Sequence, residues 1–277
     1  MIRFFVSPSD ISGNTVKLST EDAWHIRSLR LRPSETFIVC DGQGSDFVCL
    51  LGGHGNGSPS ATAEIVKALP SLGEPTIKCS VYIAYAKGER LDYAVQKSVE
   101  LGACAIILFP SERCVAIPRD TAKKNARCQR IALETAKQCG RGVVPPVSSI
   151  GSLQAAVKQA ALACLPLFFY ECEEQLRLMQ ALEKLGGLDA VSLVKQYGLD
   201  AASLDNRGGR DTVSLDNQGG HSTISVMTGP EGGFEPHEAE FAKSAGMLAV
   251  SLGSRILRCE TAPAAALAAI MFHSGNL

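Results

Sequence analysis

Two glycine-rich stretches near the C-terminus have the residue types and spacing of a ligand-binding site. The first is Thr228 to Phe234 (TGPEGGF) and the second is Leu252 to Ala262 (LGSRILRCETA). Each follows a short apolar run typical of a buried strand, and each precedes a segment with a helical pattern. Glycine lets backbone N–H groups approach a ligand without a Cβ in the way, so we expect the two loops to form one pocket.

Three charged side chains in these loops are candidates for chemistry. Arg255 and Arg258 are three residues apart and can converge on one ligand, where a fixed guanidinium would stabilise developing negative charge. No histidine is placed as a general base, and Glu231 is the nearest candidate carboxylate. The structural alternative is an arginine–glutamate pair, with Glu231 or Glu260, that only holds the loops together.

Other kinds of site fit the sequence less well. The first loop has neither the Gly-x-Gly-x-x-Gly spacing of dinucleotide sites nor the Gly-Lys-Ser/Thr ending of a P-loop. Cys259 has no base beside it in sequence, which favours a structural thiol. The ten cysteines form no Cys-x-x-Cys pair. We therefore expect reduced thiols, no metal site and a cytoplasmic protein.

The elements that position the loops follow from alternating strand-like and helical segments, which indicate an α/β domain with a mainly parallel sheet. The expected strands are 79–86, 105–109, 166–170, 224–228 and 248–252. The expected helices are 91–101, 120–139, 153–163, 174–185, 236–245 and 261–273.

The N-terminal part has a different pattern. Short alternating runs at 36–40, 47–51 and 61–65, separated by Gly and Ser clusters, predict a small β domain over residues 1–72. A linker at 70–75 then leads into a second domain, 76–277. Within it, 184–223 contains two Asp-Asn-x-Gly-Gly units, which favour turns. We expect this segment to be a surface insertion without a catalytic role.

Composition and charge limit the function. An apolar content of 45% with 20% charged residues predicts a globular soluble protein, and no apolar run is long enough to span a membrane. The net charge of −1 does not by itself indicate a nucleic-acid partner. Residues 87–141, however, carry 11 Lys and Arg against 6 Asp and Glu, and Arg27, Arg30 and Arg32 form a second basic cluster. These are candidate phosphate-binding faces or, equally, solvated helix faces.

The two loops, together with several other segments, resemble the RsmE family of ribosomal RNA uridine-N3 methyltransferases, which belong to the knotted SPOUT class. The resemblance extends to the N-terminal segments 1–6 and 23–30, the turn at 40–44, and 87–101, 111–115 and 130–145 (RIALETAKQCGRGVVP). Only 184–223 has no counterpart in it. The resemblance implies a small N-terminal PUA-like β-barrel that binds RNA, a parallel sheet with a C-terminal trefoil knot, and a homodimer.

The resemblance also implies roles for individual residues. S-adenosylmethionine would be held by Gly229, Pro230, Gly232, Gly233, Leu252, Gly253, Ile256 and Leu257. RNA would be contacted by Arg3, Arg27, Arg30, Arg113, Arg127 and Arg141. A guanidinium of Arg255 or Arg258 would stabilise the anion that forms when uridine N3 loses its proton.

The expected function is therefore S-adenosylmethionine-dependent methylation of a uridine N3 in 16S ribosomal RNA, with the RNA or the small ribosomal subunit as partner. Two alternatives remain open. One is a SPOUT enzyme with another RNA target, such as tRNA or a ribose 2′-hydroxyl. The other is a non-catalytic RNA-binding assembly factor that kept the fold.

Overall fold

The computed structural model describes residues 2–30, 32, 35–52, 62–183 and 223–277. The chain divides into two compact units, the first made of Met1–Glu74 and Leu133–Val144 and the second of Pro75–Ala132 and Pro145–Leu277. The first break falls close to the expected linker, but the sequence did not predict that 133–144 would be grouped with the N-terminal part. All of the expected insertion except residue 223 lies outside the described residues.

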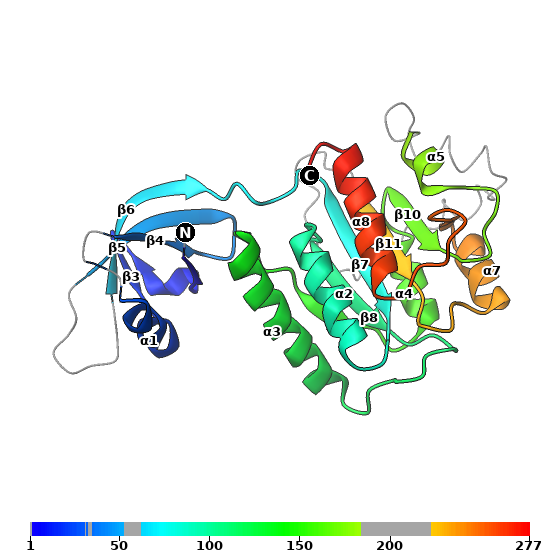
Figure 1. The fold of residues 1–277 in the computed structure, drawn as a ribbon, viewed down its shortest axis with the longest axis horizontal. Helices are drawn as coiled ribbons and strands as arrows, with labels where there is room; N and C mark the ends of the chain where they lie inside the picture. The colour runs from blue at the N-terminus through cyan, green and yellow to red at the C-terminus, as the bar shows by residue number, and fades with distance from the viewer. Residues whose placement is uncertain (1, 31, 33–34, 53–61, 184–222) are drawn as a thin grey trace, which may run out of the picture. The chain divides into compact units, whose positions relative to one another are not determined.

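The described part of the first unit contains a six-stranded sheet, the helix α1 and the C-terminal end of a helix that begins in the second unit (Figure 1). The hydrogen-bonded order is β1 (Arg3–Phe5), β4 (Thr36–Cys40), β5 (Ser45–Leu51), β6 (Thr62–Pro70), β3 (Thr15–Lys17) and β2 (Ile11–Ser12). Only the β1–β4 pair is parallel. Because β1 and β2 are at opposite ends of this order, hydrogen bonds between the described strands do not close the sheet into the expected barrel.

The core of the first unit fixes helix α1 (Thr20–Leu29) against the sheet. Ile26 of α1 is buried in one cluster with Phe4, Val16 and Phe37. The Ser19 hydroxyl caps the helix by accepting a hydrogen bond from the Asp22 backbone N–H at 3.0 Å. This helix was not predicted, because only a few of its apolar residues face the core.

The second unit contains a six-stranded parallel sheet in the order β12-β10-β11-β7-β8-β9. The strands are β7 (Lys78–Ala84), β8 (Ala105–Phe109), β9 (Val147–Ser149), β10 (Leu165–Phe169), β11 (Thr223–Thr228) and β12 (Leu248–Val250). After β9 the chain crosses to the other side of β7. In parallel sheets, ligands bind beyond the carboxyl ends of the strands where such a reversal occurs.

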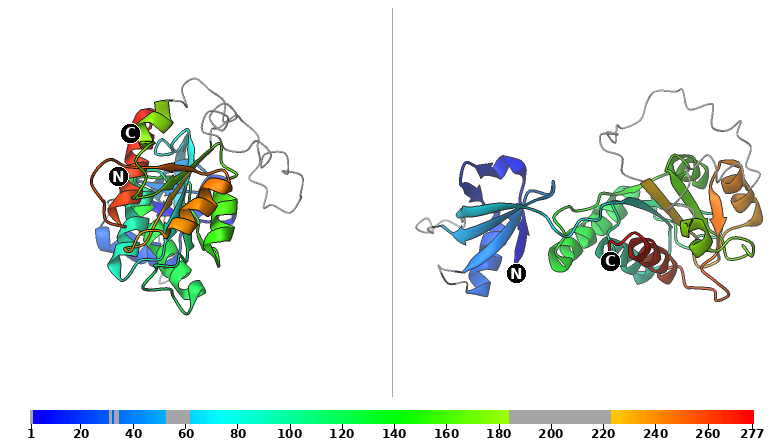
Figure 2. Two further views of the ribbon diagram at one scale, coloured as in Figure 1. Left: turned by 90° about the vertical axis from the view of Figure 1, so that its right-hand side faces the viewer. Right: turned by 90° about the horizontal axis from the view of Figure 1, so that it is seen from above.

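Helices cover both faces of this sheet (Figures 1 and 2). On one face, α2 (Glu89–Glu100) and α8 (Thr261–His273) contact each other and β7. On the other, α4 (Leu153–Ala160) contacts β7, β8 and β11, and α7 (Pro236–Ser244) packs against α4 and β12. Helix α5 (Leu178–Glu183) contacts α8, and α3 (Thr121–Cys139) begins in this unit. The expected α/β architecture is confirmed.

The expected bounds agree closely for β8 and α8 and within a few residues elsewhere. The largest differences are β6, which ends at Pro70 rather than 65, and α5, which begins at Leu178 rather than 174, and β9 was not predicted. No helix in the described part of the chain is long and apolar enough to cross a membrane.

Candidate active site

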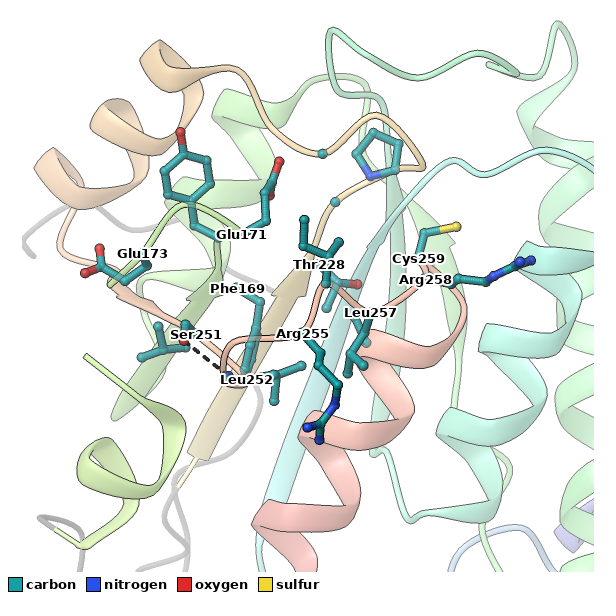
Figure 3. Close-up of a pocket in the computed structure, with 18 of the residues that line it drawn as sticks. Phe169, Glu171, Glu173, Thr228, Ser251, Leu252, Arg255, Leu257, Arg258 and Cys259 are labelled. Atoms are coloured by element: carbon teal, nitrogen blue, oxygen red, sulfur yellow. Dashed lines mark hydrogen bonds between the residues drawn. The ribbon is translucent and has the colours of Figure 1, made fainter. Parts of the chain in front are cut away.

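A cavity of about 850 Å³ opens at the carboxyl ends of β10, β11 and β12, within the second unit (Figure 3). Its size suits a ligand of a few dozen atoms. The wall consists of the two glycine loops, the segment that follows β10 and one residue of α2. The lining residues are Arg90, 169–171, 173–174, Arg177, 228–233, 250–260 and Ala262. The structure therefore brings the two predicted loops together around one cavity.

The first loop is held by a buried aromatic ring at its end. Phe234 is 1% exposed, and its ring centroid lies 4.3 Å from that of Phe168. A Cβ on Gly229 would approach the Phe234 ring to 3.1 Å, so glycine allows the close packing. Gly233 has a φ of +68°, and its backbone N–H donates to the Pro230 carbonyl at 3.0 Å. The strand end and the start of α7 are thus joined by a tight turn.

Two side chains from other segments brace this turn. The Glu171 carboxylate accepts a hydrogen bond from the Phe234 backbone N–H at 3.2 Å. Arg113 donates to the Gly232 carbonyl at 2.9 Å and to the Glu235 carboxylate at 2.6 Å. The hydrogen bond from Arg113 holds the pKa of the Glu235 carboxyl below its ordinary value. Arg113, which we expected to face RNA, is engaged in shaping the loop.

Glu231, also in the first loop, is held by hydrogen bonds from another segment of the chain. Its Oε1 accepts hydrogen bonds from the Lys87 backbone N–H at 2.8 Å and from Arg90 at 3.0 Å. Burial alone raises the pKa of this carboxyl, but these hydrogen bonds outweigh burial, and the pKa lies below its ordinary value. A low pKa makes a weak proton acceptor near neutral pH. The expected role of Glu231 as a base stays a prediction, and the contacts favour a positioning role.

Two oxygen atoms in the cavity wall are buried without a hydrogen-bond partner in the described structure. They are Thr228 Oγ1, at the end of β11, and the second carboxylate oxygen of Glu231, Oε2. Thr228 as a residue is only 1% exposed. Buried polar atoms are rarely left unpaired, because the lost hydration costs about 1–3 kcal/mol. The cavity therefore suits a ligand that supplies hydrogen-bonding groups at this wall.

The second loop forms the opposite wall. Ser251 Oγ accepts a hydrogen bond from the Gly253 backbone N–H at 3.2 Å, drawn as a dashed line in Figure 3. Gly253 has a φ of +113°, a conformation that L side chains rarely adopt. Ile256 is 83% exposed, although it lines the cavity. Cys259 is buried and burial raises the pKa of its thiol to about 12, which agrees with the structural role expected for it.

Arg255 and Arg258 both line the cavity and both are exposed. Among the described residues, neither forms an ion pair with Glu231 or Glu260, so the structural alternative for these arginines is not realised. Their side chains do not converge as expected, because they extend in different directions from the loop (Figure 3). The Arg258 backbone carbonyl accepts hydrogen bonds from Thr261 and Ala262 in the first turn of α8. The helix start thus fixes the position of this arginine.

Two of the arginines expected to bind RNA form ion pairs within the first unit, which favours a structural role for them, and their RNA contacts stay a prediction. Arg141 is 4% exposed, and its guanidinium bonds to the Glu74 carboxylate at 2.7 Å. Arg3 donates to Asp46 at 2.8 Å with a side-chain exposure of 13%. The charge of each guanidinium is thus already paired with a carboxylate. The sequence did not show this, because each carboxylate partner is distant along the chain.

The remaining three expected RNA contacts are on the surface. Arg127 is exposed but pairs with Asp92 at 2.6 Å. Arg27 and Arg30 are exposed, and neither is paired with a carboxylate of the described residues. The basic region 87–141 is therefore partly neutralised by an ion pair, whereas Arg27 and Arg30 are not neutralised in this way.

Several lining residues were missed by sequence reasoning. Thr228 was quoted only as the start of the loop, although it lines the cavity and its hydroxyl is buried without a partner in the described structure. Arg90, Glu171 and Arg177 reach the cavity from α2 and from the segment after β10. The available signal was position: residues that directly follow the carboxyl end of a parallel strand gather at one edge of the sheet.

Known proteins with the same features identify the family. Residues 73–271 match the model of the RNA methyltransferase domain family. A relative from Synechocystis sp., named ribosomal RNA small subunit methyltransferase E, is 30% identical over 97% of this chain and 76% of its own length. The protein of that name from Bacillus subtilis is 27% identical over 94% of this chain and 91% of its own length.

The fold comparison agrees. A crystal structure of a ribosomal RNA small subunit methyltransferase E from Neisseria gonorrhoeae, bound to S-adenosyl methionine, matches with a TM-score of 0.72 and 32% identity. The match covers 98% of this chain and 97% of that one. This chain belongs to the RNA methyltransferase domain family, in the group of ribosomal RNA small subunit methyltransferase E (RsmE).

Proposed function

We propose that this protein transfers a methyl group from S-adenosylmethionine to N3 of a specific uridine in 16S ribosomal RNA. Family membership gives the coarser part, S-adenosylmethionine-dependent methylation of ribosomal RNA. The observation that carries the proposal is the cavity itself. Two glycine loops at the carboxyl ends of β11 and β12 enclose a space lined by Thr228 and by Arg255 and Arg258, which have no carboxylate partner among the described residues.

The residues present fit the cofactor. The backbone of Gly229, Pro230, Gly232 and Gly233 lines one wall, and Leu252, Gly253, Ile256 and Leu257 line the other. Thr228 Oγ1 and Glu231 Oε2 would pair with the hydroxyl or amino groups of the ligand. When bound, S-adenosylmethionine supplies a methyl group made electrophilic by the neighbouring sulfonium charge. The exposed side chain of Ile256 and the half-buried side chain of Leu252 would then shield that region from water.

The protein's part in the chemistry is to stabilise the negative charge of the deprotonated uridine. Loss of the N3 proton spreads negative charge onto O2 and O4 of the base. A guanidinium fixed beside those oxygens stabilises the charge as the methyl group arrives, and removal of one such donor typically costs about 2.7–4 kcal/mol of barrier. Arg258 is the best placed candidate, because the first turn of α8 holds its backbone. Glu231 would keep Arg90 at the edge of the cavity.

Two finer features of the family are part of the proposal. The trefoil knot is supported by hydrogen bonds between the segment after β12 and the segment after β10. The Ser251 backbone N–H donates to the Leu176 carbonyl, and the Ser251 carbonyl accepts from the Leu178 backbone N–H. A homodimer is supported by large apolar side chains left on the surface of the second unit, notably Ile256, at 83% exposed, and Phe272, at 74%.

The experiment that tests the proposed function is a modification map of RNA from a strain that lacks the gene. We expect one uridine of 16S RNA to lose its methyl group and to regain it when the gene is restored. If the lost modification lies in a tRNA or on a ribose, the proposed target is wrong, although the cofactor assignment would survive. If no modification is lost, the protein is an assembly factor rather than an enzyme.

A further inference from the structure

The tryptophan of the first unit lies outside its core. Trp24 is on α1 and its side chain is 58% exposed, whereas Ile26, two residues later, is 1% exposed. Tryptophan is normally among the more buried residues, because covering its large ring is favourable. The chain contains one tryptophan in 277 residues, and the fold leaves it on the surface.

A guanidinium lies against this ring. The Arg27 Cζ atom is 5.6 Å from the Trp24 ring centroid, one helical turn away on the same face of α1. The contact restricts the motion of both side chains. The helix beneath them is fixed by the buried Ile26 and by the His25 ring, which packs edge-on against Phe4 at 5.6 Å. The ring and the guanidinium therefore form a platform on a rigid element.

Positive charge surrounds the platform. Arg30 ends α1 with a φ of +52°, the one non-glycine residue with positive φ in the described part of the chain. Arg32 is also exposed. The nearby carboxylates form no ion pair with these side chains among the described residues. Glu35 accepts from the Arg32 backbone N–H, the Asp22 carboxylate accepts from the Ser19 hydroxyl and lies near Lys137, and Glu21 has no ion pair in the described part of the chain.

We propose that Trp24 and Arg27 form a base-stacking platform for an unpaired nucleotide of the RNA, with Arg30 and Arg32 contacting the flanking phosphates. An exposed aromatic ring beside arginines is how proteins bind single-stranded RNA, because every base has a face that can stack and each nucleotide carries a charge. This deepens the proposed function and rests on its RNA substrate. It adds a contact in the first unit that is separate from the methyl-transfer cavity.

The single tryptophan makes the test direct, because all tryptophan fluorescence of this chain comes from Trp24. The probe is a short single-stranded oligouridylate, with a duplex of the same length for comparison. We expect saturable quenching by the single strand and much weaker quenching by the duplex. If a labelled single strand binds by anisotropy while the fluorescence of Trp24 does not change, the platform is not the binding surface and the inference is wrong.

Variants separate stacking from general effects. Trp24→Ala should weaken single-strand binding about tenfold, as expected when one base–aromatic stack is removed, while Trp24→Phe should keep most of the affinity. Val66→Ala is the matched control, because Val66 is also 58% exposed in the same unit, and it should bind normally. Arg30→Gly should fold at least as well as the parent, since glycine suits the positive φ, and yet lose affinity several-fold.

The outcomes distinguish this inference from the proposed function. Binding of S-adenosylmethionine, measured by calorimetry on the same variants, should not change. If Trp24→Ala binds RNA and modifies ribosomal subunits like the parent, the platform is refuted and the proposed function stands. If RNA quenches the fluorescence of Trp24 but the parent transfers no methyl group, the platform stands and the proposed function is refuted. Protection of Trp24 by a ribosomal protein without any RNA would also overturn the inference.

Discussion

The Glu171 carboxylate occupies the space that a Cβ on Gly233 would fill, while it accepts a hydrogen bond from the neighbouring Phe234 N–H at 3.2 Å. Gly233 is therefore required for two reasons. Its φ of +68° suits glycine, and its missing side chain lets the carboxylate reach the backbone of the loop. The shape of the cofactor wall depends on this contact between the segment after β10 and the loop after β11.

Gly233→Ala should displace Glu171 and disturb the loop, so calorimetry should show S-adenosylmethionine affinity reduced at least tenfold. Gly246→Ala is the control, because Gly246 also has a positive φ (+92°) but no atom within 4 Å of the added Cβ. It should cost some stability and leave the affinity unchanged. Equal affinities in the two folded variants would show that the contact with Glu171 does not shape the pocket.

Thr228→Val replaces the unpaired hydroxyl by a methyl group of similar size. We expect the unfolding temperature without ligand to stay the same or rise, because no hydrogen bond is lost, and cofactor affinity to fall about three- to tenfold. Ser225→Ala should behave in the opposite way. The Ser225 hydroxyl is buried and donates to the Ala160 carbonyl at 2.8 Å, so its loss should lower stability and spare affinity. An unchanged affinity in Thr228→Val would remove this hydroxyl from the cofactor site.

Arg258→Ala should lower the single-turnover rate of methyl transfer more than tenfold with little change in cofactor affinity, because the charge acts in the transition state. Since Arg255 and Arg258 point in different directions, we expect Arg255→Ala to have the smaller effect on this rate. A parent-like rate for Arg258→Ala would mean that this guanidinium does not face the reacting base.

RNA affinity should fall with salt, and the slope of the log–log plot should decrease by roughly 0.7 for each phosphate that the protein no longer neutralises. Arg30→Gly should produce such a decrease. Arg127→Gln should produce a smaller one, because the Arg127 charge is already paired with Asp92 at 2.6 Å. Titrations of an RNA fragment at several salt concentrations measure both slopes. Equal decreases would show that the ion pair opens when RNA binds.

Those features that depend on local pattern were predictable from the sequence. Strand β8 is a continuous apolar run and β11 is mainly apolar, and the glycine loops follow strands directly, so the fold class and the two walls of the cavity could be inferred. Strand β9 was missed because its three residues, Val147–Ser149, include two serines. Helix α1 was missed because Trp24 faces solvent, which obscures the pattern of its buried face.

Tertiary pairing was not readable from the sequence. Glu171 and Phe234 are 63 residues apart, and Arg3 and Arg141 are each held by a carboxylate from another part of the first unit. The number of charges in a segment does not tell whether an arginine is available to bind a phosphate or already forms an ion pair with a carboxylate. The different directions of the Arg255 and Arg258 side chains could not be predicted either, because the spacing of residues along a loop does not fix the direction of their side chains.

The central claim is methyl transfer to a uridine N3, and the product itself tests it most directly. Purified protein is incubated with small ribosomal subunits from a strain without the gene and with isotope-labelled S-adenosylmethionine. The 16S RNA is then digested to nucleosides and separated by mass spectrometry against standards. The account predicts that the label appears in N3-methyluridine and depends on Arg258. Label in a ribose-methylated or C5-methylated nucleoside, or no label in the RNA, would contradict it.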